Sequence, residues 1–409
     1  MKKNYILVLA VLSISVGLMG QMFQPGYYNL NIFEPEIIDA RAEALGKTSI
    51  LSSTGANFIF NNPAMLSNLK GKNIQISCRS IFGKTEIKSE YDDETYKTEN
   101  EFKFHFKFNG LSFSMPYALF HNKDIKFGFG IGYRTYYDWG FNKHSKSSGD
   151  YSDDYDLNFH GGLNVLVLGG GINNKEKLYG GIAISFPFLS NVSSEYEDDE
   201  DNEKSDGSLK GTFFTLSGAY VLNEKITFGI RLRTGFELEY ENSYDMGWYG
   251  MDFGIPSELG LAVEYKPKTN LKLYAEYLTR GLGDYDVNTP FGHMDIYYFS
   301  DNGFALRTGL EAGANNVFRC GFFIQSVPIY KLTTDEDDDL VSDNTPLAEI
   351  GFTTGLGIKL NANSSLDLFG IYSFLKYNDK YNDDYWRDQY SDEYSYSRIK
   401  IDCSVGYHF

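Results

Sequence analysis

Residues 399–409 read Ile-Lys-Ile-Asp-Cys-Ser-Val-Gly-Tyr-His-Phe, and this stretch decides the fold class. An apolar residue occupies every odd position, and a polar residue or glycine occupies every even one. Because successive side chains of a β-strand point to opposite faces, the stretch predicts a strand with one apolar and one polar face. Such strands suit a wall whose outer face meets lipid and whose inner face meets water.

A last strand of this kind, ending on an aromatic residue, resembles that of bacterial outer-membrane β-barrels. The resemblance implies that Phe409 is part of the signal read by the barrel assembly machinery. At the other end, two lysines precede an apolar run from about Tyr5 to Met19, which predicts a secretory signal peptide over residues 1–20. No later stretch has the roughly 18 consecutive apolar residues of a membrane-spanning helix, so a closed barrel is the remaining way to cross a bilayer. The alternative is a secreted β-protein of the periplasm or cell surface.

Aromatic residues make up 16% of the chain, and most fall in segments that alternate in the same way. The apolar sets include Phe102, Phe104, Phe106 and Phe108; Phe127, Phe129, Ile131 and Tyr133; Ile350, Phe352, Leu356 and Ile358; and Ile226, Phe228, Ile230, Leu232, Phe236, Leu238 and Tyr240. Arg231, Arg233, Glu237 and Glu239 are predicted on the face opposite the last set. Many segments exceed the ~9–11 residues that cross hydrocarbon, so the strands are expected to project beyond the lipid.

Brief polar turns alternate with longer segments along the chain. The turns are 121–124, 173–176, 223–225, 268–270, 315–316 and 361–364, and the longer segments are 88–98, 143–155, 197–207, 245–255, 289–302, 332–346 and 381–395. This alternation predicts about fourteen strands, with short turns on the periplasmic side and long, acidic loops outside the cell. The count would change by two if residues 98–120 contained a further hairpin near Asn109-Gly110.

A barrel of about fourteen strands is too wide for its own wall side chains to fill, so its lumen must hold water, a plug or a ligand. The glycines predicted to line this lumen are Gly128, Gly130, Gly132, Gly351, Gly355 and Gly357. Glycine there leaves room inside the bore and also eases strand curvature, and we expect both roles.

Charge and motif content exclude several classes of function. The formal net charge of -18 is a poor match for nucleic acid, whose binding depends on Lys and Arg. The six histidines lack the spacing of a zinc site, the acidic runs do not fit a calcium-binding loop, and no Ser/His/Asp set clusters. Three widely separated cysteines, Cys78, Cys320 and Cys403, predict no disulfide framework. We therefore expect no enzyme activity, no cofactor and no metal.

Residues 21 to about 71 do not alternate. Glu34-Pro35-Glu36 predicts the start of a short helix that continues to Ala44, and Gly46 is a plausible stop. Residues 53–66 then form a second apolar, partly helical stretch. The expected organisation is a signal peptide at 1–20, a plug or hatch at 21–71 inside the barrel mouth, and a transmembrane antiparallel barrel at 72–409.

The hatch sequence resembles that of the FadL/TodX long-chain fatty acid transporter family and of related PorV-type barrels. The resemblance rests on Ala42-Glu43-Ala44-Leu45-Gly46 and on residues 56–66, Ala-Asn-Phe-Ile-Phe-Asn-Asn-Pro-Ala-Met-Leu. Those families carry an Asn-Pro-Ala-Gly-Leu motif before the first strand; Asn62, Pro63, Ala64 and Leu66 match it, and Met65 replaces the usual glycine. The resemblance implies a fourteen-stranded barrel with a hatch.

The resemblance also implies a function: outer-membrane passage of hydrophobic compounds, with long-chain fatty acids the leading expectation. A hydrophobic small molecule would bind beside the hatch, near Phe58, Phe60, Asn62, Pro63 and Ala64, and leave sideways where a strand kinks. The alternative for Phe58 and Phe60 is that they only anchor the plug. Strand prolines that interrupt the pattern are Pro116, Pro187 and Pro328. Any of them could mark the kink, and the alternative is that they lie beyond the lipid.

Three arginines, Arg134, Arg231 and Arg233, are predicted to face the lumen, where Arg can clamp a carboxylate. The alternative is an internal ladder of ion pairs with acids such as Glu237 and Glu239. Two other functions also remain open from sequence. One is a PorV-type secretion-accessory or structural barrel that binds proteins; the other is a general polar porin.

Overall fold

The computed structural model describes residues 39–408, except for short gaps at 92–93, 118–123, 139–140, 149–153, 198–201, 245–246, 256, 281–284, 290–291, 296–302, 315, 335–339, 362 and 384–387. The predicted signal peptide, the first part of the predicted hatch, the turn at 121–123 and Phe409 lie outside the described residues.

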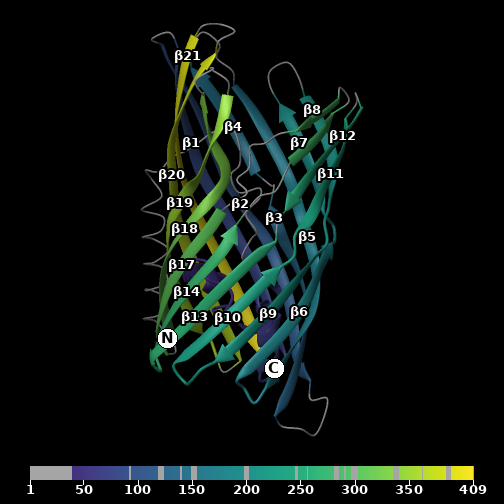
Figure 1. The fold of residues 1–409 in the computed structure, drawn as a ribbon, viewed down its shortest axis with the longest axis vertical. Helices are drawn as coiled ribbons and strands as arrows, with labels where there is room; N and C mark the ends of the chain where they lie inside the picture. The colour runs from purple at the N-terminus through teal and green to yellow at the C-terminus, as the bar shows by residue number, and fades with distance from the viewer. Residues whose placement is uncertain are drawn as a thin grey trace.

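Fourteen of the 21 strands found in the described residues form a closed antiparallel ring (Figure 1). Each pairs with the next and the last pairs with the first, so the series of neighbours returns to its start. In ring order they are β1 (Asn73–Tyr91), β2 (Glu94–Tyr117), β3 (Ile125–Asp138), β5 (Asp154–Asn174), β6 (Leu178–Pro187), β9 (Phe213–Val221), β10 (Ile226–Arg233), β13 (Glu258–Lys268), β14 (Leu271–Arg280), β17 (Gly303–Gly313), β18 (Asn316–Thr334), β19 (Leu340–Lys359), β20 (Ser364–Asp383) and β21 (Asp388–His408). The predicted fourteen-stranded barrel is confirmed.

Seven further strands extend this ring at the end away from the short turns, at the top of Figure 1. They are β4 (Phe141–Ser148), β7 (Asn191–Glu197), β8 (Asn202–Lys210), β11 (Phe236–Tyr244), β12 (Gly247–Ile255), β15 (Tyr285–Thr289) and β16 (Gly292–Asp295). The predicted long loops are therefore wrong in extent: 88–98 and 197–207, for example, are mostly paired strand. Strand pairing continues beyond the lipid-facing part of the wall, because backbone hydrogen bonds hold the strands together there without alternating apolar side chains.

Strand β2 runs unbroken through Asn109-Gly110, so the alternative of an extra hairpin is wrong. The irregularity is instead a β-bulge: Ser77 pairs with Gly110 and Cys78 with Phe108, which leaves Asn109 as the extra residue. The short turns are in the predicted places where they are described. At 223–225, for example, the Asn223 side chain accepts hydrogen bonds from two backbone amides and fixes the turn between β9 and β10.

The two faces of the wall differ as the alternation predicts. In β10, Phe228 and Ile230 are 46% and 47% exposed, whereas Arg231 is 2% exposed and faces the bore. Large apolar side chains are exposed in the same way on most other ring strands, which gives the apolar exterior of a transmembrane barrel. Among the described residues no helix has both the length and the apolar character needed to cross a membrane.

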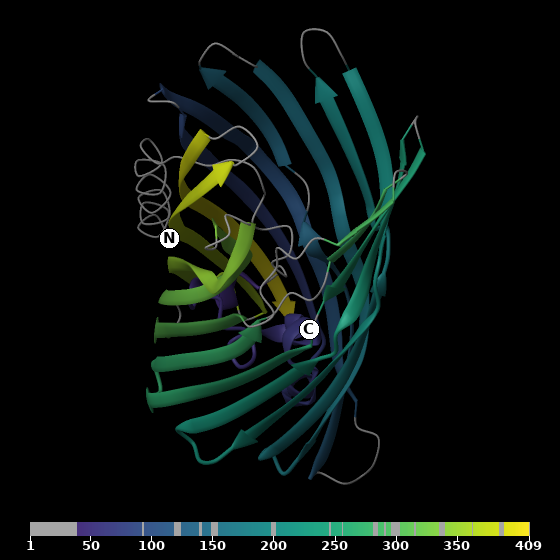
Figure 2. The same cartoon turned by 45° about the horizontal axis from the view of Figure 1, so that its top comes forward.

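A plug segment, residues 39–71, occupies the bore near the short-turn end, in purple in Figure 2. It contains helix α2 (Ala40–Ala44), the 3-10 turn η2 (Gly55–Asn57), helix α3 (Phe58–Asn61) and the 3-10 turn η3 (Pro63–Asn68). The Asp39 side chain caps helix α2 by accepting the Arg41 amide, and the predicted helix start at residues 34–36 lies outside the described residues. Gly46 ends this helical stretch as predicted, with φ of 72°.

Glycines on the inner wall allow the plug to approach the strands. A Cβ placed on Gly128 would lie 2.1 Å from the Leu66 carbonyl oxygen, and one on Gly132 would lie 2.4 Å from the Phe60 ring. Of the other predicted lumen glycines, Gly130 and Gly355 also face plug atoms, whereas Gly351 and Gly357 make room for wall side chains, Phe323 and Arg319. Here the room these glycines leave is filled by the plug or by other wall residues.

Candidate functional site

The plug is held to the wall by a buried ion-pair network around Arg41. Its guanidinium donates to both oxygens of Glu311, at 2.6 and 3.0 Å, and to the Tyr274 hydroxyl at 2.9 Å. Glu311 also accepts from Arg319 and Lys272, so one carboxylate serves three cations. A bidentate Arg–carboxylate pair fixes both distance and orientation, so this contact sets the position of α2 against β14, β17 and β18.

A second carboxylate, Glu276 of β14, holds the loop that follows α2. One of its oxygens accepts the backbone amides of Ser49 and Ile50, at 2.7 and 2.8 Å. Arg307 approaches the other oxygen at 3.4 Å and donates to the Lys47 carbonyl oxygen at 2.9 Å. Glu276 is 1% exposed, so its charge is stabilised by these plug amides and by Arg307 and not by water.

Asp39, at the start of the described plug, is a fully buried titratable group. It caps α2 and also accepts the Thr54 amide at 2.7 Å. Burial raises the pKa of its carboxyl to about 6, and the Asp367 carboxylate acts in the same direction.

Beside the plug, on the β3–β12 side of the bore, aromatic rings and arginines form what we call the aromatic–arginine cluster. It comprises Phe58 and Phe60 of the plug together with Arg134, Tyr136, Tyr137, Phe213, Arg233 and Phe236. The Arg134 guanidinium lies 5.6 Å from the Phe60 ring centre and 4.7 Å from that of Tyr136. Arg233 lies 5.2 Å from the Tyr136 ring, so two cations stack on one tyrosine.

The structure brings together four of the predicted site residues, Phe58, Phe60, Arg134 and Arg233, in this cluster. Arg231 lies beside them and donates to Ser49 of the plug at 3.0 Å.

Arg231 and Arg233 form ion pairs, as the alternative predicted, but with an acid other than Glu237 and Glu239. Arg231 and Arg233 share Glu258, at 2.5 and 3.4 Å, whereas Glu239 pairs with Lys210. Glu258 comes from β13, the neighbour of β10 in the ring.

The prediction that Phe236 lies on the outer face with Phe228 is wrong. Strand β10 ends at Arg233 and β11 begins at Phe236, so the two residues between them interrupt the alternation. Phe236 stacks inside the bore on Phe213, with ring centres 4.8 Å apart.

Sequence reasoning missed Tyr136, Tyr137 and Phe213, the buried centre of the cluster. Tyr136 is the extra residue of a bulge in β3, since Thr135 pairs with Asn164 and Tyr137 with Leu163. The bulge directs two consecutive tyrosines inward, and their rings meet at 4.7 Å. Two adjacent tyrosines break the alternation of this strand, and this break in the sequence could have indicated the bulge.

The other predicted site residues, Asn62, Pro63 and Ala64, lie against the wall at β5, β6 and β9. Asn62 donates to the Ile50 carbonyl oxygen within the plug, and the Ala64 amide donates to Ser217 of β9 at 3.0 Å. A Cβ on Gly181 of β6 would lie 2.2 Å from the Ala64 nitrogen. Pro63 and Ala64 therefore anchor the plug to the wall, and Asn62 joins two parts of the plug.

Two of the three prolines proposed as kink markers lie at irregularities of the wall. β6 ends at Pro187, and Pro328 lies where the register of β18 against β19 shifts. Hydrogen bonding to the wall continues past the end of β6, because the Phe188 amide donates to the Asn164 carbonyl oxygen and the Leu209 amide donates to the Ser190 carbonyl oxygen. Pro116 lies within the paired length of β2.

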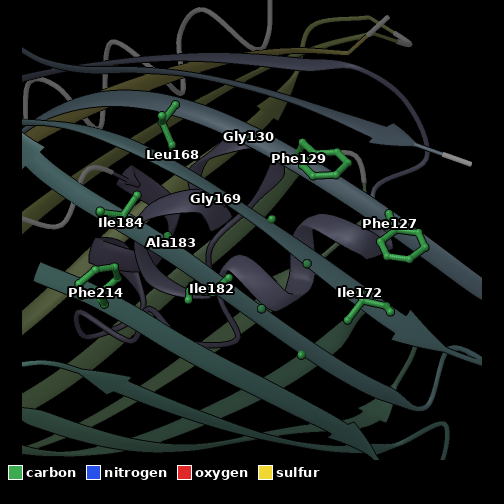
Figure 3. A pocket seen from close by; sticks show the side chains of 14 residues that line it. Phe127, Phe129, Gly130, Leu168, Gly169, Ile172, Ile182, Ala183, Ile184 and Phe214 are labelled. Carbon is green, nitrogen blue, oxygen red and sulfur yellow. The ribbon is translucent and has the colours of Figure 1, made fainter. Parts of the chain in front are cut away.

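The outer wall opposite Pro63-Ala64 carries an open apolar groove of about 800 Å³ (Figure 3). Its rim includes Phe129, Leu168, Ile172, Ile182 and Phe214, and its floor is glycine backbone of β5 and β6. Pairing between β5 and β6 is continuous from Val165 to Asn174, so the groove does not open into the bore.

Chemically, these arrangements suit binding. The cluster offers aromatic surface with cationic groups, which fits an apolar molecule bearing an acid group. No group of three or more His, Cys, Asp or Glu side chains suited to a metal ion occurs within the described part of the chain.

No family model and no curated protein matches the sequence. Several solved structures match the fold over nearly the whole chain. A Pseudomonas aeruginosa FadL homologue superposes with a TM-score of 0.60 at 12% identity, covering 91% of this chain and 98% of its own. The P. putida toluene transporter TodX gives 0.59 at 14% identity, with 91% and 99% covered. The Ralstonia pickettii toluene transporter TbuX gives 0.51 at 12%, with 94% and 100% covered. The chain therefore has the fold of the FadL-type channels, as the hatch sequence implied.

Proposed function

We propose that this protein is an outer-membrane channel for hydrophobic compounds, working by diffusion and not by catalysis. The observation that carries the proposal is the aromatic–arginine cluster beside a plug inside a closed, lipid-facing barrel. The similar structures support it, since they include transporters of toluene and a channel for monoaromatic hydrocarbons.

The finer proposal is that the compound carries an acid group, as a long-chain fatty acid does. An uncharged hydrocarbon needs only the rings of the cluster. Buried arginines cost desolvation energy, and Arg233 shares its partner Glu258 with Arg231. The Arg233 Nε atom has no hydrogen-bond partner among the described residues. A carboxylate could accept from this position, which favours an amphipathic acid over toluene.

The test is equilibrium binding of radiolabelled oleate and toluene to the purified protein in detergent. Arg233→Met keeps the apolar stem and removes the charge. Losing a hydrogen bond to a charged group costs about 1.5–3 kcal/mol, so oleate should bind roughly 10–100-fold more weakly. Toluene binding should not change. Lys126→Met, which removes an exposed cation at the short-turn end, is the control.

Equal loss of both compounds would contradict the acid-group proposal, and binding of neither would contradict the channel for hydrophobic compounds. Mass spectrometry of the material that copurifies with the protein tests the alternative of a PorV-type barrel that binds proteins. A bound cargo or translocon protein, with no small molecule, would favour the PorV-type barrel.

A further inference from the structure

We infer that the groove on the outer wall is a docking site for one acyl chain of a membrane phospholipid. The groove is lined by β3, β5, β6 and β9, and Figure 3 shows its side chains around a strip of bare backbone with the plug behind it. Its lining side chains are all hydrocarbon.

The groove exists because two glycines face outward. Along β5, exposed Leu168 and Ile172 flank Gly170 at the two-residue period of one face. Along β6, Gly180 has the same parity as Ile182, which is 52% exposed. A Cβ on Gly180 would meet only the Ile172 side chain, at 4.0 Å, so open space lies above it.

The wall is also thin at this place. Gly171 and Gly181 face inward, and Cβ atoms there would lie 2.4 Å from the Pro63 carbonyl oxygen and 2.2 Å from the Ala64 nitrogen. The plug therefore packs directly on the inner surface of the backbone. The outer surface at Gly180 has no side chain covering it, and the Phe129 ring borders the outer surface at Gly170. A void beside a packed wall forfeits dispersion contacts that a chain lying in it would restore.

The surroundings of the groove indicate which kind of molecule occupies it. The groove is continuous with the exposed apolar band of the barrel, in which Leu216 of β9 and Ile131 of β3 are its exposed neighbours. This band faces bilayer hydrocarbon, so the molecules that reach the groove are acyl chains. A concave apolar site contacts a chain on more sides than the convex remainder of the wall does, which makes residence there longer than in the surrounding lipid layer.

The test uses full-length protein in vesicles containing a phosphatidylethanolamine with a photoreactive diazirine on one acyl chain. After illumination, mass spectrometry maps the labelled peptides. We expect about tenfold more label on the groove residues of β5 and β6 than on equally exposed apolar residues of β10 and β17, as roughly ten additional carbon contacts would give. Gly180→Leu should abolish the preference, since its Cβ meets open space and its side chain would occupy the groove.

Thr308→Leu is the control, because it places the same leucine side chain at an exposed position of β17 away from the groove. It should leave the labelling pattern unchanged. Even labelling around the barrel, or a preference that survives Gly180→Leu, would overturn the inference. Displacement of the label by oleate or toluene would also overturn it, because the groove would then belong to the transported compound. The inference does not depend on the proposed function, since lipid labelling can succeed where oleate and toluene fail to bind.

Discussion

Two adjacent glycines of β6 provide a direct test of how the plug is seated. Gly180 and Gly181 differ only in the face they present. Replacing either with alanine adds one methyl group and removes the same backbone freedom, which by itself stabilises a strand by roughly 0.5–1 kcal/mol. The difference in stability between Gly180→Ala and Gly181→Ala therefore measures the effect of the contacts that the added methyl group makes.

On the outer face the new methyl group meets open space, with the nearest atom at 4.0 Å. On the inner face it would lie 2.2 Å from the Ala64 nitrogen and 2.5 Å from the Ala64 Cα. Ordinary contact begins near 3.4 Å, so the plug or the wall must move by about 1.2 Å (3.4 minus 2.2). Both colliding groups are backbone and cannot rotate away. Overpacking of this kind costs about 1–3 kcal/mol, so we expect Gly181→Ala to be less stable than Gly180→Ala by that amount.

The assay is urea unfolding of each variant refolded into the same vesicles, with single-channel conductance as a second readout. If the plug yields instead of the wall, stability will change little and the conductance of Gly181→Ala will rise. Gly180→Ala should match the parent protein in conductance. Equal stability and equal conductance of the two variants would refute the proposed seat of the plug on β6.

The remaining predictions concern the plug contacts and the barrel seam. Glu276→Gln should destabilise the plug by about 1.5–3 kcal/mol, because a neutral amide replaces the buried carboxylate that holds two plug amides. Increased proteolysis of residues 39–71 in the folded barrel would measure this loss of stability. An unchanged digestion pattern would argue against the contact. The pKa of Asp39 is about 6 in the folded protein against 3.8 for an unperturbed carboxyl, so the folded state binds the extra proton and stability should rise as the pH falls from 7 through 6 and level off below 4. Asp39→Asn should remove that part of the pH dependence from urea unfolding, and identical pH profiles would contradict it. Cys78 and Cys403 are opposed in the β1–β21 register, where Cα atoms are ~4.5–5.5 Å apart and within disulfide range. An added oxidant should therefore join them, and the denatured protein, made more compact by the internal crosslink, should migrate faster on a non-reducing gel. No crosslink would place the seam in another register.

The number of wall strands and the two faces of each strand could be predicted from the chain alone. Alternation at Phe228, Ile230 and Arg231 assigns an outer and an inner face because the two-residue period is a local property of any strand. Short turns such as 223–225 are equally local, since one asparagine side chain fixes the chain reversal. Counting these signals predicted fourteen strands and a plugged bore.

The contacts between side chains inside that bore could not be predicted, because they depend on how distant strands and the plug are placed relative to one another. Glu258 reaches Arg231 because of the register between β10 and β13, and Phe236 turns inward because two residues interrupt the ladder before it. Tyr136 joins the cluster through a bulge, and Gly181 accommodates the plug through contact with a residue more than a hundred positions away. Each of these depends on the stagger of strands around a closed cylinder and on how a separate segment sits within it. No local period in the chain encodes that geometry.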